Sequence, residues 1–339
     1  MSLPDYHFLP APLWLITVLH LLLFTLHLAA MNFLVGGIVV VLWGRFQDRW
    51  HNPTVSRYLT LAPTAMAATV TLGVGSLLFL QVTYPGPFYS ASIVSGWFWL
   101  LVIVAATSGY YLLYGSAFQK NLRAARYYLI FAWLCFFYIS FVYSATFSMA
   151  ERVEVYRDLY ARAQHGWVLN PEVGSYLFRW LHMLAGALTV GGFWFGLLGK
   201  NDDEGFRNGK WFFTGGMLLA FLFGSLYLVN LGPIIPAFMK SSAIWWLTGS
   251  IVLALGSVHF FFKKWFWPAG GMLFLSLFGM VFTRHAARGL ILQGYHDPAN
   301  IKVAPQWSVF GLFLACLLLA VGLLVYMLRI FFRAEVKKL

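Results

Sequence analysis

The sequence predicts an all-α, polytopic membrane protein with about nine transmembrane helices, arranged as two repeated four-helix units plus one. Hydrophobic residues make up 60% of the 339 residues and charged residues only 10%, whereas soluble domains carry about 25% charged residues. Long apolar runs separate the basic residues, which is the distribution found in membrane proteins. These observations exclude a soluble enzyme, a disordered chain and a nucleic-acid partner, and they make membrane lipid the expected surroundings.

Nine apolar runs approach or exceed the roughly 20 residues that a helix needs to cross a bilayer. Helices are the expected form because open backbone cannot face lipid. The runs cover residues 12–43, 58–83, 93–115, 127–149, 175–198, 211–231, 243–262, 267–284 and 307–331. We divide the chain into a first four-helix unit, an outer loop, a second four-helix unit, another outer loop, and a ninth helix with its tail: 1–150, 151–174, 175–285, 286–306 and 307–339. The first outer loop has mixed charge and is expected to hold an interfacial helix.

The basic residues predict the orientation of the helices. With the N-terminus outside, 15 of the 23 lysines and arginines fall in the inner segments. Inner loops of membrane proteins carry such an excess, so we expect the N-terminus outside and the C-terminus inside. The loops between the runs are short, so any soluble redox module belongs to a partner chain.

The first and fifth runs contain a repeat. Residues 26–45 and 181–200 align without a gap, and this alignment matches His27 with His182. The same alignment matches Val35-Gly36-Gly37 with Val190-Gly191-Gly192. Weaker matches keep the same order in later runs: Gly75-Ser76-Leu77 with Gly224-Ser225-Leu226, and Met149-Ala150-Glu151-Arg152 with His285-Ala286-Ala287-Arg288. The glycines allow close helix packing in lipid, whereas an ionisable side chain within a span is a functional candidate.

Several histidines are expected on the outer side of the membrane. His20 and His27 are seven residues apart, which places them on one helix face, about 10.5 Å apart along the axis. The repeat aligns His182 in depth with His27, and the eighth run ends beside His285. The topology therefore gathers His20, His27, His182 and His285, with Met149 and Met239, toward one side of the bilayer.

Histidine and methionine on facing helices are typical axial ligands of haem b. The two cysteines form no covalent haem-attachment motif, and none is needed for haem b. We expect two or three haem groups, with His27 and His182 each holding one and with Met149 and His285 as opposite ligands. The candidate set is His20, His27, His182 and His285 as iron ligands, Met149 and Met239 as further haem contacts, and Arg179, Arg284 and Arg288 as partners of the haem propionates. The alternative is that each buried histidine only hydrogen-bonds a neighbouring helix.

The helix plan and the His-x8-Gly pattern on the first and fifth runs resemble subunit I of cytochrome bd quinol oxidases. His27 with Gly36 is similar to that family's first-helix haem ligand, and His182 with Gly191 is similar to its fifth-helix ligand of low-spin haem b. Residues 93–115 contain no acidic side chain, although the family carries two carboxylates there for oxygen chemistry. The family's long quinol loop is reduced here to Gly232–Ser242. The resemblance therefore implies the low-spin haem scaffold without the oxygen-reducing site.

These features favour an electron-transfer subunit in a bacterial inner membrane. It would pass electrons between the quinone pool and a periplasmic partner, a multihaem cytochrome c or another oxidoreductase, within a hetero-oligomer. A bound quinone is a further expectation. Two alternatives stay open: a divergent bd-type terminal quinol oxidase subunit, and a haem-free membrane anchor or transporter subunit.

Overall fold

The computed structural model describes residues 8–119, 121–162 and 165–336, which form helices joined by loops. The long helices are α1 (Leu13–Trp43), α2 (Pro53–Thr83), α4 (Gly96–Phe118), α5 (Leu122–Ala150), α7 (Gly174–Leu198), α8 (Asp203–Asn230), α10 (Ala243–Phe262), α11 (Phe266–Ile291) and α12 (Trp307–Val336). The short ones are α3 (Pro85–Val94), α6 (Val153–Arg162), α9 (Ile235–Lys240) and the 3-10 turns η1 (Gly232–Ile234) and η2 (Pro298–Asn300). The predicted all-α class is confirmed.

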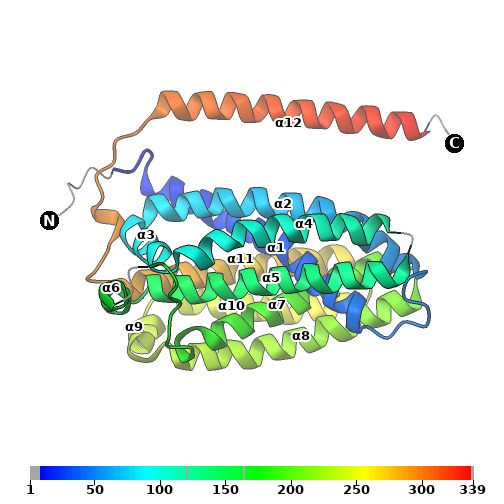
Figure 1. The fold of residues 1–339 in the computed structure, drawn as a ribbon, viewed down its shortest axis with the longest axis horizontal. Helices are drawn as coiled ribbons and strands as arrows, with labels where there is room; N and C mark the ends of the chain where they lie inside the picture. Colours follow the sequence, from blue (N-terminus) through cyan, green and yellow to red (C-terminus); the bar gives the residue numbers. More distant parts are fainter. Residues whose placement is uncertain (1–7, 120, 163–164, 337–339) are drawn as a thin grey trace. The chain divides into compact units, whose positions relative to one another are not determined.

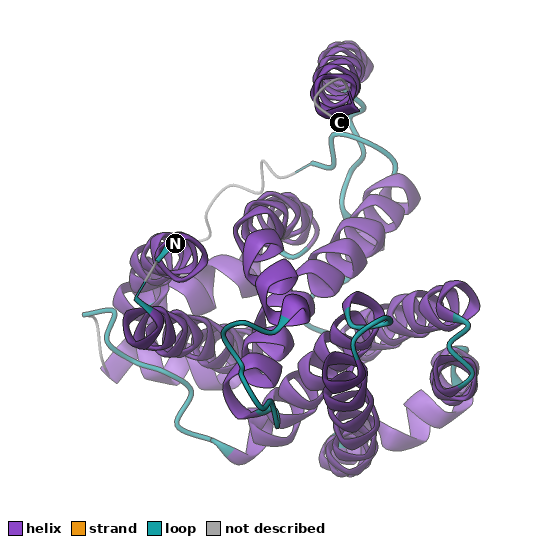
Figure 2. Cartoon of the chain, turned by 90° about the vertical axis from the view of Figure 1, so that its right-hand side faces the viewer, coloured by secondary structure: helices purple, strands orange, loops and turns teal. Residues whose placement is uncertain are grey.

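Eight helices in the described part of the chain are long and apolar enough to cross a membrane, and they correspond to the first eight predicted runs. Within residues 18–297, which form one compact unit, these helices run side by side (Figure 1) and Figure 2 shows them end-on. The chain is therefore a multi-pass membrane protein. Helix α12 occupies the ninth predicted run; it belongs to a second unit, in which Leu9 and Val303 form an isolated parallel bridge.

Proline and N-cap residues account for several helix ends. Asn52 caps α2, and its Oδ1 accepts hydrogen bonds from the backbone amides of Thr54 (2.9 Å) and Val55 (3.1 Å), which satisfies amides that the helix leaves free. Pro85 opens α3 immediately after α2, because proline suits the first turn but cannot donate within a helix. The sequence did not predict α3 as a separate helix. The helix expected in the first outer loop is present as α6.

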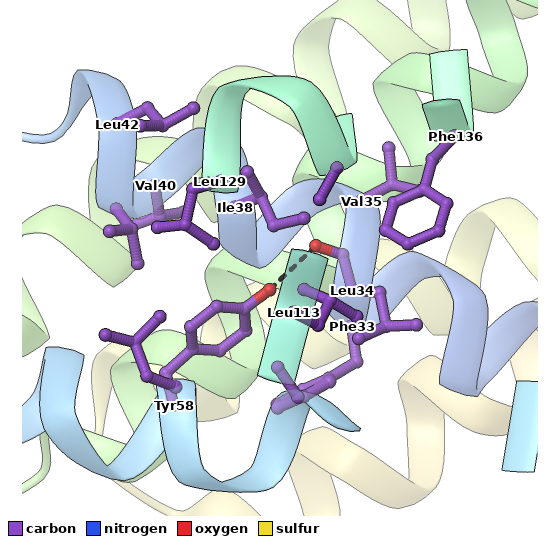
Figure 3. Packing of buried hydrophobic residues seen from close by; sticks show 14 of the residues in the cluster. Phe33, Leu34, Val35, Ile38, Val40, Leu42, Tyr58, Leu113, Leu129 and Phe136 are labelled. Atoms are coloured by element: carbon purple, nitrogen blue, oxygen red, sulfur yellow. Dashed lines mark hydrogen bonds between the residues drawn. The ribbon is translucent and has the colours of Figure 1, made fainter. Parts of the chain in front are cut away.

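The core around α1 and α2 consists of buried aliphatic and aromatic side chains. Tyr58 is almost completely buried, and its hydroxyl donates to the carbonyl of Leu34 across 2.8 Å (Figure 3). This hydrogen bond satisfies the polar atom of an otherwise apolar site. Helices α7 and α8 instead pack through small residues: a Cβ on Gly216 would lie 2.9 Å from the Thr189 hydroxyl oxygen. Close approach of this kind fixes the helices that carry the histidines.

Candidate functional site

His27 on α1 and His182 on α7 make the same hydrogen bond to the next long helix. The Nδ1 atom of His27 lies 2.8 Å from the carbonyl oxygen of Thr69 on α2, and Nδ1 of His182 lies 2.9 Å from that of Ala220 on α8. A carbonyl oxygen can only accept, so Nδ1 donates in both rings. The Nε2 atoms then carry the lone pair, and no described residue hydrogen-bonds to them. This is a tautomer in which imidazole binds a metal.

Two glycines make room for these rings. A Cβ on Gly73 would lie 2.7 Å from Nδ1 of His27, and a Cβ on Gly224 would lie 2.9 Å from Nδ1 of His182. Each glycine follows the acceptor carbonyl by four residues, so both halves of the chain hold their histidine in the same way. By these contacts Gly73 is the structural equivalent of Gly224, whereas the sequence alignment had matched Gly75 with Gly224.

His20 also hydrogen-bonds a backbone carbonyl of α2, and it lies seven residues before His27 on α1. Its Nδ1 atom lies 3.1 Å from the carbonyl oxygen of Ser76, and its side chain is 7% exposed. The ring of Phe24 stacks between the two histidines of α1, with ring centres 5.9 Å from His20 and 6.1 Å from His27. The seven-residue spacing thus places His20 and His27 on one face of the helix.

A histidine from α11 completes this group. The ring centre of His285 lies 6.3 Å from that of His20, with the planes inclined by 55°. The Nδ1 atom of His285 is buried, and no described residue hydrogen-bonds to it. A small cavity beside His20 is lined by His20, His27, Tyr143 and Arg288, among others. The structure therefore places His285 beside His20, with His27 on the far side of Phe24, while His182 lies on α7 in the other half of the repeat.

The three predicted arginines meet at one carboxylate, Glu151, which directly follows α5. Arg179 donates through Nη1 to Oε2 of Glu151 (3.1 Å), and Arg288 donates through Nε to Oε1 (3.2 Å). Arg284 also donates to Oε1 of Glu151. A second nitrogen of Arg179 donates to the carbonyl of Ser144 across 2.7 Å. These residues form the Glu151 cluster, at the end of the bundle where α1 begins.

The Glu151 cluster carries an excess of buried positive charge. Burial alone raises the pKa of Glu151, but the guanidinium groups of Arg284, Arg179 and Arg288 outweigh it and lower the pKa to about 2. The carboxylate is therefore ionised, and it balances one of three positive charges. The Nη1 atom of Arg284 is buried, and it has no hydrogen-bond partner among the described residues. Because unpaired buried charge is costly, this cluster is suited to bind anionic groups such as carboxylates.

The predicted methionines are placed differently from the histidines. Met149 is fully buried in an apolar cluster that includes Leu80, Tyr84 and Phe88. Met239 lies on α9 with 51% of its surface exposed. A third methionine that the sequence had not singled out, Met183, accepts a hydrogen bond from the Ser144 hydroxyl at 3.8 Å. It directly follows His182 in the chain.

The donor set differs from that of a metal ion bound by protein side chains alone. Within the described ranges, no three or more His, Cys, Asp or Glu side chains gather as a metal site. Structural and catalytic zinc sites need three or four such ligands, whereas a haem iron takes only one or two from the protein. The single and paired histidines that leave Nε2 available could hold an iron porphyrin, and the arginines could bind its carboxylates.

The sequence did not indicate two parts of this site. The acceptor carbonyls of Thr69, Ser76 and Ala220 are backbone groups and leave no residue signature. Glu151 was visible only as part of a weak repeat match. The sequence predicted Arg179, Arg284 and Arg288 as partners of haem propionates and did not predict that they share a carboxylate.

The histidines offer Nε2 atoms as ligands, and the arginines of the Glu151 cluster offer positive charge. No model of a known protein family matches the chain, and no curated protein sequence matches it.

Proposed function

We propose that the chain is a membrane-embedded b-type cytochrome that passes electrons between the quinone pool and a periplasmic redox partner. His27 and His182 each ligate one haem b iron through Nε2. The observation that carries the proposal is the matched Nδ1 hydrogen bond of these histidines to Thr69 and Ala220, at 2.8 and 2.9 Å. A purely structural histidine has no need to keep Nε2 free of donors, whereas an iron ligand requires it.

The surrounding residues supply what an electron-transfer haem needs. The Nδ1–H bond fixes the orientation of each ring and increases the basicity of Nε2. Gly73 and Gly224 have no side chain, which leaves space for the rings of His27 and His182, respectively. The arginines of the Glu151 cluster offer guanidinium groups to the propionates of a haem at that end of the bundle, because planar carboxylates suit paired N–H donors. Haem b, when bound, supplies a one-electron ferric/ferrous couple.

The electron balance involves a quinone and a second redox protein. A quinol releases two electrons and two protons, and the electrons pass singly through the cytochrome to an acceptor such as a multihaem cytochrome c. The reverse direction uses the same sites and reduces quinone. The proposal places the chain in a bacterial inner membrane with its N-terminus outside, supported by the distribution of basic residues. The histidine-rich end then faces the periplasm.

The resemblance to subunit I of cytochrome bd oxidases supports the haem scaffold and not its oxygen chemistry. Helix α4, the third span, has no acidic or basic side chain. Proton delivery to a reduced oxygen needs such groups within the membrane. We therefore propose electron transfer within a hetero-oligomer, whose partner subunits carry the remaining cofactors.

The test is haem content per chain. Full-length protein purified in detergent is expected to give a b-type reduced-minus-oxidised spectrum, and pyridine haemochrome analysis counts the haems. His27→Ala and His182→Ala are each expected to lower the count by one. The matched control is His259→Ala, which alters an exposed histidine of α10.

Three results would contradict the proposal. A colourless wild-type protein would favour the haem-free anchor or transporter. Carbon monoxide binding to the reduced wild-type protein would favour the terminal oxidase. An unchanged haem count in both His27→Ala and His182→Ala would remove the ligand assignment.

A further inference from the structure

His20 and His285 form a pair that the function proposed above does not use. Their rings come from different helices, α1 and α11, and their centres are 6.3 Å apart. Two imidazoles that bind one metal from opposite sides, each at about 2.0 Å, place their ring centres roughly 6 Å apart. The separation of this pair therefore fits two axial ligands of a single iron.

The hydrogen bonds of the pair leave nitrogen atoms available. Nδ1 of His20 donates to the Ser76 carbonyl at 3.1 Å, so its Nε2 carries the lone pair. His285 has a buried Nδ1 without a hydrogen-bond partner among the described residues, which is costly for a purely structural side chain. One histidine of the pair, His20, and one arginine of the Glu151 cluster, Arg288, border the same cavity.

The charge next to the pair matches a dianion. Arg284 precedes His285 in the chain and Arg288 follows it by one helical turn, so both lie at the same end of α11. With Arg179 they hold three positive charges against the single carboxylate of Glu151. The excess of two positive charges equals the charge of two propionates. A haem bound here would make the cluster neutral, which removes the cost of unpaired buried charge.

The other half of the repeat has no such pair. The alignment that matches His27 with His182 matches His20 with Ser175, and His285 corresponds to Met149. Ser175 accepts a hydrogen bond from Asn170 at 3.0 Å, in a network of small polar side chains. The histidine pair is therefore an addition to the first half and not a consequence of the repeated scaffold.

We propose that His20 and His285 are the axial ligands of a third haem, distinct from those at His27 and His182, with its propionates bound by Arg179, Arg284 and Arg288. This inference rests on the proposed function only in taking haem b as the cofactor, since its ligands are different residues. The site lies at the end of the bundle and exchanges single electrons with a partner outside the membrane. A haem held by these residues would supply a one-electron ferric/ferrous couple there.

The experiment compares single and double variants of the full-length protein in detergent. His20→Ala, His285→Ala and the double variant are each expected to lose the same one haem, with loss of one low-spin ferric signal in electron paramagnetic resonance. His285→Met keeps a ligand and is expected to retain the haem with a changed signal, which separates ligation from folding. His296→Ala is the control, because Nε2 of His296 already donates to the Thr83 carbonyl at 2.9 Å.

The outcomes distinguish this inference from the proposed function. Unchanged haem content in His20→Ala and His285→Ala, with loss in His182→Ala, would overturn the third site alone. Loss of two haems in the double variant would overturn the pairing, since each histidine would then serve its own iron. Loss in His20→Ala and His285→Ala, with full retention in His27→Ala and His182→Ala, would overturn the proposed ligands and leave the third site standing.

Discussion

Gly191 of α7 packs against Gly36 of α1, and the repeat alignment matches these two glycines with each other. A Cβ on Gly191 would lie 2.6 Å from the Cα of Gly36, and a Cβ on Gly36 would lie 3.0 Å from the Cα of Gly191. Equivalent residues touch each other in this way when a two-fold axis runs through their contact. A pseudo-two-fold axis therefore passes between α1 and α7, and it relates His27 to His182.

Gly191→Ala is expected to destabilise the protein by about 1–3 kcal/mol, because the added methyl group meets backbone and the two helices must separate. The readout is the thermal unfolding midpoint in detergent, together with haem content. Gly186→Ala on the same helix is the control, since a Cβ there has nothing within 4 Å. Equal midpoints for the two variants would contradict the close contact.

Gly73→Ala and Gly224→Ala are expected to weaken haem binding at His27 and His182, respectively. The methyl group would displace the ring from its carbonyl partner, and loss of such an outer contact typically costs about 10–100-fold in metal affinity. Haem retention during dilution measures the effect. Gly215→Ala on α8 is the control because that position opens onto free space; a similar loss of haem in this control would contradict the role of the two glycines.

The sequence predicted the eight spans and the equivalence of His27 and His182 in the repeat, because the length of an apolar run and a gapless repeat can both be read from the residues. It did not predict α3, because most of this helix falls between the runs 58–83 and 93–115 and begins with Pro85-Gly86-Pro87, a pattern typical of a turn. The hydrogen-bond acceptors of the histidines could not be predicted, because they are backbone carbonyls of other helices, many residues away in the sequence. His285 was expected opposite His27 or His182, whereas the structure places its ring beside His20. Helix rotation decides such contacts, and periodicity alone does not give it.

Arg288→Gln is expected to lower the midpoint potential of the haem at His20 and His285. A nearby positive charge favours the ferrous form, and its removal favours the ferric form by on the order of 1 kcal/mol, or roughly 30–60 mV for a one-electron couple. A spectroelectrochemical titration measures the shift. Arg207→Gln, an exposed arginine of α8, is the control. An unchanged potential in Arg288→Gln would place the propionates elsewhere.

Glu151→Gln is expected to cost about 3–5 kcal/mol of stability at neutral pH, since it leaves three buried guanidinium groups without a counter-ion. An ordinary glutamate has a pKa of 4.5, and that of Glu151 is lowered to about 2. Folding therefore favours the ionised form, and its stabilisation is complete above about pH 4.5 and lost as the pH falls toward 2. The wild-type unfolding midpoint should fall across that interval, and that of Glu151→Gln should fall less. Glu172→Gln, which removes an exposed ion pair with Arg152, is the control and should cost no more than about 1 kcal/mol. Equal losses in the two variants would show that the Glu151 cluster is solvated and carries no buried charge.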